Sequence, residues 1–91
     1  MKVFRWDLVT AMNKETYYWL SERNDNRGVV LGAIVSKGEL FSPVVLNRFR
    51  SGWSTINELL SLKDAKEAIE KKLFDDGIIQ EGETIEDYTL P

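Results

Sequence analysis

The pattern of apolar residues in the first half of the chain is typical of β-strands. Phe4, Trp6 and Leu8 alternate with residues that point to the other side, and this period of two predicts a strand over residues 3–9. Further extended segments are predicted, in order, at residues 16–23, 29–36 and 40–49. The segment 29–36 is apolar on both faces, so we expect it to lie centrally in a sheet.

Polar residues that favour turns separate these segments, at 13–15, 23–28 and 37–39. Gly32 inside the third strand predicts either the close approach of a neighbour or a bulge. Pro43 lacks the N–H donor that a strand needs, so the fourth strand is expected to begin late, at Val44, or to lie at an edge. Residues 53–60 fit either a helical turn or the end of a strand.

A helix is predicted after residue 60, because apolar residues recur there at spacings of three, four and four. These residues are Leu62, Ala65, Ile69 and Leu73. Ser61 with Asp64 three positions later resembles a capping box, and Gly77 is placed to end the helix. A helix of about 15 residues is marginal alone, so it needs a sheet to pack against.

The fold class predicted from this order is α+β, with an antiparallel meander of three to four strands and one C-terminal helix packed on one face. The length of 91 residues fits a single α+β domain, which we assign to residues 1–79. Residues 80–91 are predicted to be an acidic C-terminal tail, which carries Glu81, Glu83, Glu86 and Asp87.

The composition indicates an intracellular setting. The chain has no cysteine, so disulfides and thiolate metal sites are impossible, and a secreted domain this small would more often contain disulfides. The first residues do not have the pattern of a signal peptide, and the longest apolar run, 29–35, is too short for a membrane span. We therefore expect a cytoplasmic protein.

The absence of histidine lowers the expectation of catalysis, because histidine is the commonest general base and metal ligand. Two carboxylate pairs remain as candidates, Asp75 with Asp76 and Glu22 with Asp25. Neighbouring carboxylates in turns are usually only solvated. We expect no catalytic residues, no cofactor, no metal and no small-molecule substrate, and hence a binding protein rather than an enzyme.

The aromatic content of 11% is the main indication of a binding surface. Three consecutive aromatic residues in the second strand must place at least one ring on each side of a sheet. One helix covers one face, so rings on the other face would be free for contact. The predicted interface, to a protein partner or to a second copy, comprises Trp6, Tyr17, Tyr18 and Trp19.

Single-stranded nucleic acid is the alternative partner, because arginines beside aromatic rings can hold phosphates and stack bases. The residues for this role are Arg23, Arg27, Arg48, Arg50 and Trp53. Residues 1–53 carry eight Lys or Arg against five Asp or Glu, whereas residues 54–91 carry four against ten. The net charge of −3 argues against a dedicated nucleic-acid binder, which usually has a large basic excess.

The helix region, Leu60-Ser61-Leu62-Lys63-Asp64-Ala65-Lys66-Glu67-Ala68-Ile69-Glu70, resembles small phage and prophage accessory proteins. In those proteins a β-meander leads into a helix that opens with a similar S-L-x-x-A-K-x-A-I-E run. The resemblance implies binding to host or phage proteins or to nucleic acid. It assigns no functional residue to this chain.

Overall fold

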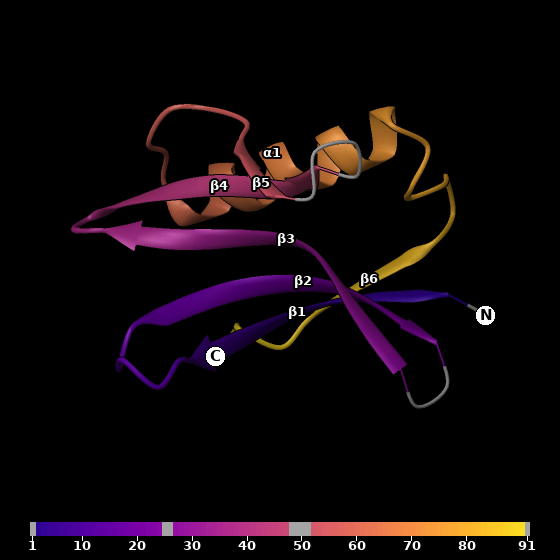
Figure 1. Cartoon of the computed structure of the whole chain (residues 1–91). Coiled ribbons are helices and arrows are strands. Elements are labelled where there is room, and N and C mark those ends of the chain that lie inside the picture. Colours follow the sequence, from indigo (N-terminus) through magenta and orange to yellow (C-terminus); the bar gives the residue numbers. More distant parts are fainter. Residues whose placement is uncertain (1, 25–26, 48–51, 91) are drawn as a thin grey trace.

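An antiparallel meander forms the first part of the fold (Figure 1). The structure is a computed structural model that describes residues 2–24, 27–47 and 52–90, without the side chains of Arg27 and Asn47. The meander comprises β1 (Val3–Thr10), β2 (Thr16–Asn24), β3 (Arg27–Lys37), β4 (Leu40–Asn47) and β5 (Gly52–Thr55). The strand order is β5-β4-β3-β2-β1-β6, so the segment predicted to be central, β3, does lie inside the sheet.

The sixth strand, β6 (Thr84–Asp87), pairs in parallel with β1. The α+β class is thus confirmed, but the prediction of a purely antiparallel meander of three to four strands is wrong, because the sheet has six strands and is mixed. This strand lies within the segment 80–91. Its sequence, Thr-Ile-Glu-Asp, has too few apolar residues to show a period of two, and its pairing with β1 through the backbone makes it a strand.

Strand β4 begins at Leu40 and lies between β3 and β5, so both positions expected from Pro43 were wrong. Pro43 is tolerated because its backbone nitrogen and carbonyl face β5 and not β3. Its carbonyl accepts the N–H of Ile56 at 3.1 Å, just beyond the end of β5, so the missing donor removes no bond to β3. The ambiguous segment 53–60 continues strand β5 to Thr55 and is not helical afterwards.

The helix α1 (Leu62–Asp75) begins and ends where the sequence predicts. Ser61 is its N-cap, and the Ser61 hydroxyl accepts the N–H of Asp64 at 3.2 Å. Gly77 follows the C-cap with φ of 76°, and the next residue, Ile78, donates its N–H to Leu73 at 2.9 Å. This is the glycine-dependent helix end called a Schellman motif. No helix in the described chain is long and apolar enough to cross a membrane.

We call the sheet face toward α1 the inner face and the opposite one the outer face. The helix lies closest to β3 and β4 (Figure 1), and its predicted stripe is confirmed by the burial of Ala65, Ile69 and Leu73. Gly32 allows this close packing, because a Cβ there would lie 2.7 Å from Ile69 Cγ2. The inner-face side chains of the core are Phe4, Trp6, Leu20, Ile34 and Val45.

Candidate functional site

The outer face carries a row of apolar side chains that runs across three neighbouring strands. Trp19 on β2 pairs with Ala33 on β3, and Ala33 pairs with Val44 on β4. The sequence neighbours Leu20, Ile34 and Val45 belong to the core on the inner face. Because side chains alternate along a strand, the row of Trp19, Ala33 and Val44 must face away from α1.

These side chains enclose a shallow groove of about 400 Å³. The groove is lined by Tyr17, Trp19, Val30, Ala33, Val35, Val44 and Trp53. Trp53 is 50% exposed, whereas Tyr17 and Trp19 are partly buried. Every lining side chain is apolar or aromatic, so the groove offers apolar contact and very few polar groups.

The groove is hollow because a small residue stands between large ones. Ala33 lies directly opposite Trp19 on one side and Val44 on the other. Only 6% of Ala33 is exposed although no helix covers it, because the larger neighbours rise around it. The loop and helix residues that pack on the core do so on the side of α1, so none of them lines this groove. These residues are Ile56, Leu60, Leu62 and Ile78.

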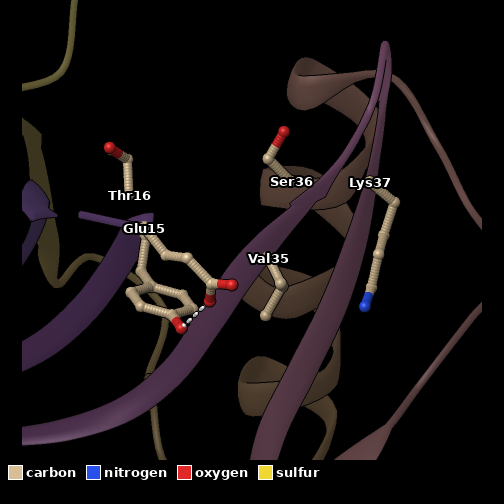
Figure 2. A pocket seen from close by; sticks show the side chains of 6 residues that line it. Glu15, Thr16, Val35, Ser36 and Lys37 are labelled. Carbon is tan, nitrogen blue, oxygen red and sulfur yellow. Dashed lines mark hydrogen bonds between the residues drawn. The ribbon is translucent and has the colours of Figure 1, made fainter. Parts of the chain in front are cut away.

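A polar pocket of about 330 Å³ adjoins one end of the groove (Figure 2). It is lined by Glu15, Thr16, Tyr17, Val35, Ser36 and Lys37. Tyr17 and Val35 line both hollows, so the groove and the pocket are continuous. Figure 2 shows the Lys37 side chain on one side of Val35 and the Glu15 carboxylate on the other, with Ser36 pointing away.

The Glu15 wall of the pocket is held by a tight turn before β2. Lys14 adopts φ of 66°, and Ala11 donates its N–H to the Glu15 carbonyl at 2.8 Å. The Glu15 carboxylate accepts the Tyr17 hydroxyl at 2.5 Å. This hydrogen bond, with a smaller contribution from burial, raises the pKa of Tyr17 above its ordinary value. Tyr17 is therefore a fixed, neutral ring between the groove and the pocket.

The structure divides the four aromatic residues of the predicted interface between the two faces. Tyr17 and Trp19 lie in the outer groove. Trp6 is 1% exposed in the core, and Tyr18 packs against that core with its ring edge-on to Phe41 at 6.0 Å between centroids. Trp6 and Tyr18 are thus removed from the outer surface, because alternation along β2 separates neighbours and Trp6 points toward the helix.

Of the predicted nucleic-acid strip, the structure describes the side chains of Arg23 and Trp53. Trp53 lies in the groove on the edge strand β5, whereas Arg23 lies on β2 opposite Gly28. Arg48, Arg50 and the side chain of Arg27 lie outside the described residues.

The candidate carboxylate pairs are engaged by lysines where the structure describes them. Asp75 and Asp76 contact Lys71 and Lys72 at 3.8 and 3.2 Å. Glu22 contacts Lys2 at 3.5 Å. Asp25, the second member of that pair, lies outside the described residues. Within those residues, no three acidic side chains gather closely enough to hold a metal ion.

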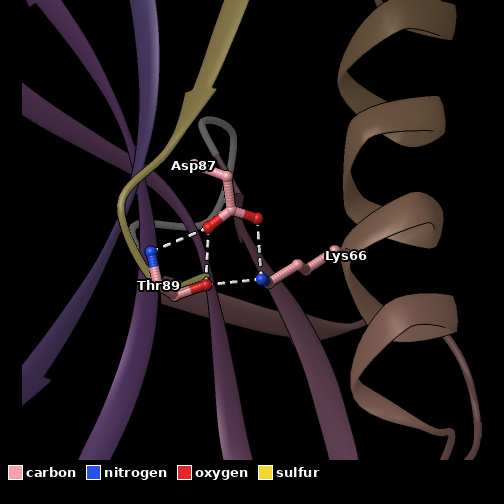
Figure 3. Close-up of polar contacts among 3 residues, drawn as sticks. All are labelled: Lys66, Asp87 and Thr89. Atoms are coloured by element: carbon pink, nitrogen blue, oxygen red, sulfur yellow. Dashed lines mark hydrogen bonds and ion pairs between the residues drawn. The ribbon is translucent and has the colours of Figure 1, made fainter. Parts of the chain in front are cut away.

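A second polar cluster ties the helix to β6 on the inner side of the sheet (Figure 3). Lys66 of α1 donates from Nζ to Asp87 at 2.7 Å and to the Thr89 hydroxyl at 2.5 Å. Thr89 also donates its N–H and its hydroxyl to Asp87. Burial alone would raise the pKa of Asp87, but the hydrogen bonds from Lys66 and Thr89 outweigh it and lower that pKa. The cluster therefore holds the chain end against α1.

The chain matches no protein-family model, no curated protein and no solved structure. The groove and its polar end thus have to be interpreted from their own chemistry. Sequence reasoning placed Trp53 only in the nucleic-acid strip, and it did not single out Ala33, Val35 or Lys37. The signal that could have found the groove is the apolar character of β3 on both faces, since one helix cannot cover both.

Proposed function

We propose that this chain is a non-enzymatic binding module that engages a protein partner through the outer groove. The observation that carries the proposal is the groove itself, in which two tryptophans and one tyrosine surround an apolar floor on a sheet face turned away from the helix. A phage or mobile-element role is a further hypothesis that rests only on the resemblance of residues 60–70.

The chemistry of the groove supports a protein partner more than nucleic acid. Tryptophan and tyrosine are enriched among residues that contribute most to protein interfaces, and contiguous exposed apolar patches mark such surfaces. Phosphate binding would need several cations beside the rings. Lys37 at the polar end is the only cation among the residues that line the described groove and its adjoining pocket.

A capture experiment with matched variants tests the proposal. The wild-type chain and the variants Trp53→Gln and Phe74→Gln are used as baits in nuclease-treated extract of the native cell. Phe74 on α1 is 49% exposed, close to the 50% of Trp53, but it lies outside the groove. We expect a partner that binds the wild type and Phe74→Gln and is lost with Trp53→Gln.

Two results would contradict the proposal. Equal loss of the partner with both variants would show that general surface hydrophobicity, not the groove, retains it. Loss of all partners after nuclease treatment, with binding that falls steeply as salt is added, would favour the nucleic-acid alternative. Sedimentation of the purified chain distinguishes self-association, because a groove-mediated dimer would dissociate in Trp53→Gln and persist in Phe74→Gln.

A further inference from the structure

The polar end of the groove indicates what kind of segment fits there. Tyr17 and Val35 line both the groove and the polar pocket, so one extended occupant can lie in both. Its apolar side chains would cover the ring of Trp19 and the floor at Ala33. The part of the occupant that enters the pocket would meet Glu15 and Lys37.

The two charges at this end differ in how far their partners satisfy them. The Glu15 carboxylate lies on one wall of the pocket and accepts a hydrogen bond from the Tyr17 hydroxyl. The Lys37 ammonium lies on the other side of Val35 and has no ion pair within the described part of the chain (Figure 2). Arg5 and Asp7, also on the outer face, neutralise each other at 2.9 Å.

An anionic group in the pocket would thus be attracted to the Lys37 wall and repelled from the Glu15 wall. A cation at the same place would meet the reverse field. The Glu15 carboxylate keeps its charge, but one of its oxygens already accepts the Tyr17 hydroxyl, whereas Lys37 makes no hydrogen bond or ion pair within the described residues. Such a separation of charges fixes the direction and register of an occupant more than its affinity. An exposed ion pair adds little binding energy, and the apolar groove supplies the rest.

We propose that the occupant of the groove is an extended apolar peptide segment that places a carboxylate, from Asp, Glu or a chain end, against Lys37. This inference rests on the proposed function and adds to it the chemistry and the orientation of the partner. Its basis is charge complementarity at the single groove end where the described chain offers an unpaired cation.

Selection of peptides from a random displayed library tests the proposal without knowledge of the natural partner. The library is selected in parallel against the full wild-type chain, Lys37→Glu and Lys63→Glu. Lys63 is an exposed lysine of α1, so its reversal changes the net charge equally without touching the groove. Folding of each variant is checked by circular dichroism before selection.

We expect the wild-type and Lys63→Glu pools to contain apolar peptides with an acidic residue or a free carboxyl end at a constant position. The Lys37→Glu pool should lose that acid and gain Lys or Arg there. A synthetic peptide from the wild-type pool should bind Lys37→Glu about three- to tenfold more weakly than it binds the wild-type chain, because an exposed ion pair becomes a repulsion. Added salt should shrink this difference.

The outcomes separate the two proposals. Peptides that need Trp53 but show no acid preference, or that bind Lys37→Glu as tightly as wild type, overturn the inference and leave the proposed function standing. Peptides that bind Trp53→Gln as well as wild type overturn the proposed function itself. Failure to enrich any peptide counts against both, because an open apolar groove should select some apolar sequence.

Discussion

The two faces of the sheet carry similar aromatic side chains but bury them to different extents. On the inner face, Phe4 and Trp6 are at most 1% exposed beneath α1. On the outer face, Trp53 is 50% exposed, and Tyr17 and Trp19 are only partly buried. All these rings lie on strands of one sheet, and on β2 the ring of Tyr18 packs on the core between the outward Tyr17 and Trp19, so strand propensity does not explain the difference.

The helix makes the difference, because it covers one face and no more. Burial of an aromatic ring on the inner face contributes to folding in the isolated chain. A ring on the outer face can give most of that free energy only when something else covers it. The comparison therefore assigns stability to the inner face, and the proposed function assigns binding to the outer one. The following predictions test that division.

The largest expected effect is the loss of a ring from the inner face. Phe4→Ala removes a fully buried side chain and should lower the free energy of unfolding by about 3–5 kcal/mol. Trp53→Gln should change it by no more than about 0.5 kcal/mol, as surface substitutions do. Urea unfolding followed by circular dichroism measures both. Should Phe4→Ala not fold, Phe4→Leu serves in its place. It removes fewer buried carbon atoms, so the loss should be about 1–2 kcal/mol.

Equal destabilisation by Trp53→Gln and the Phe4 variant would break the comparison. It would mean that the outer groove already belongs to the core of the isolated chain. Phe74 on α1 is almost as exposed as Trp53, so Phe74→Gln provides the baseline for replacing a half-exposed ring.

The second prediction concerns the fit between helix and sheet at Gly32. A Cβ at this position would lie 2.7 Å from Ile69 Cγ2, and Ile69 is fully buried and cannot move away easily. Gly32→Ala should therefore lower the free energy of unfolding by about 1–3 kcal/mol, as overpacked cores do. Adding Ile69→Leu, which removes the clashing methyl group, should restore part of the loss in a double-mutant cycle. Additive losses would show that no such contact exists.

The sequence predicts those segments whose position follows from the local spacing of apolar residues. It does not predict segments that are placed by backbone pairing with a distant strand. The stripe of α1, its cap at Ser61 and the alternation in β1 depend on local spacing, so their positions were predicted correctly. Strand β6 depends on backbone pairing with β1, more than 70 residues away, and Thr-Ile-Glu-Asp carries no such pattern. The position of β4 was predicted wrongly from Pro43, because a strand inside a sheet tolerates proline when its carbonyl faces away from the neighbour that would need the missing N–H.

The candidate site was predictable only in part for the same reason. Alternation within Tyr17-Tyr18-Trp19 shows that these rings divide between two faces, but not which face receives the helix. The register between strands decides that Ala33 lies beside Trp19 and that Tyr17 meets the Lys37 end. The register depends on how the strands pair in the assembled sheet, so it cannot be predicted from the sequence of one strand alone.

The third prediction tests how the inner side holds β6. Lys66→Met removes the ion pair with Asp87. The side chain of Lys66 is 11% exposed and that of Asp87 is 22% exposed. Breaking a buried pair costs about 3–5 kcal/mol, but Asp87 keeps water contact and its bonds from Thr89, so we expect about 1–2 kcal/mol. The outer groove should be unaffected, and peptides selected on the wild type should still bind.

The pH dependence of this variant has a defined sign. The lowered pKa of Asp87 means that its contribution to stability is present above the unfolded pKa, about 3.9, and is lost as pH falls through the folded pKa. The difference between wild type and Lys66→Met should therefore be largest near neutral pH and shrink below about pH 4. A difference that stays constant down to pH 2 would assign the loss to packing of the lysine stem instead.

The smallest expected effect is a gain in stability on the inner side, at Glu70. Burial, followed by repulsion from Asp87 and Glu67, raises the pKa of Glu70, while the indole N–H of Trp6 lowers it. Among the described residues that N–H has no hydrogen-bond partner within normal limits, and burial dominates the raised pKa of Glu70.

A carboxyl whose folded pKa is raised destabilises the fold when charged, and the penalty disappears as pH falls through that pKa. Glu70→Gln should therefore be more stable than wild type at pH 7, by up to about 0.5 kcal/mol. The gain should fade toward about pH 4, where the unfolded glutamate also becomes protonated. Urea unfolding at several pH values checks this. A variant less stable at pH 7 would show that the charge of Glu70, held near Trp6, supports the inner face, and the division of roles between the faces would then include an electrostatic part.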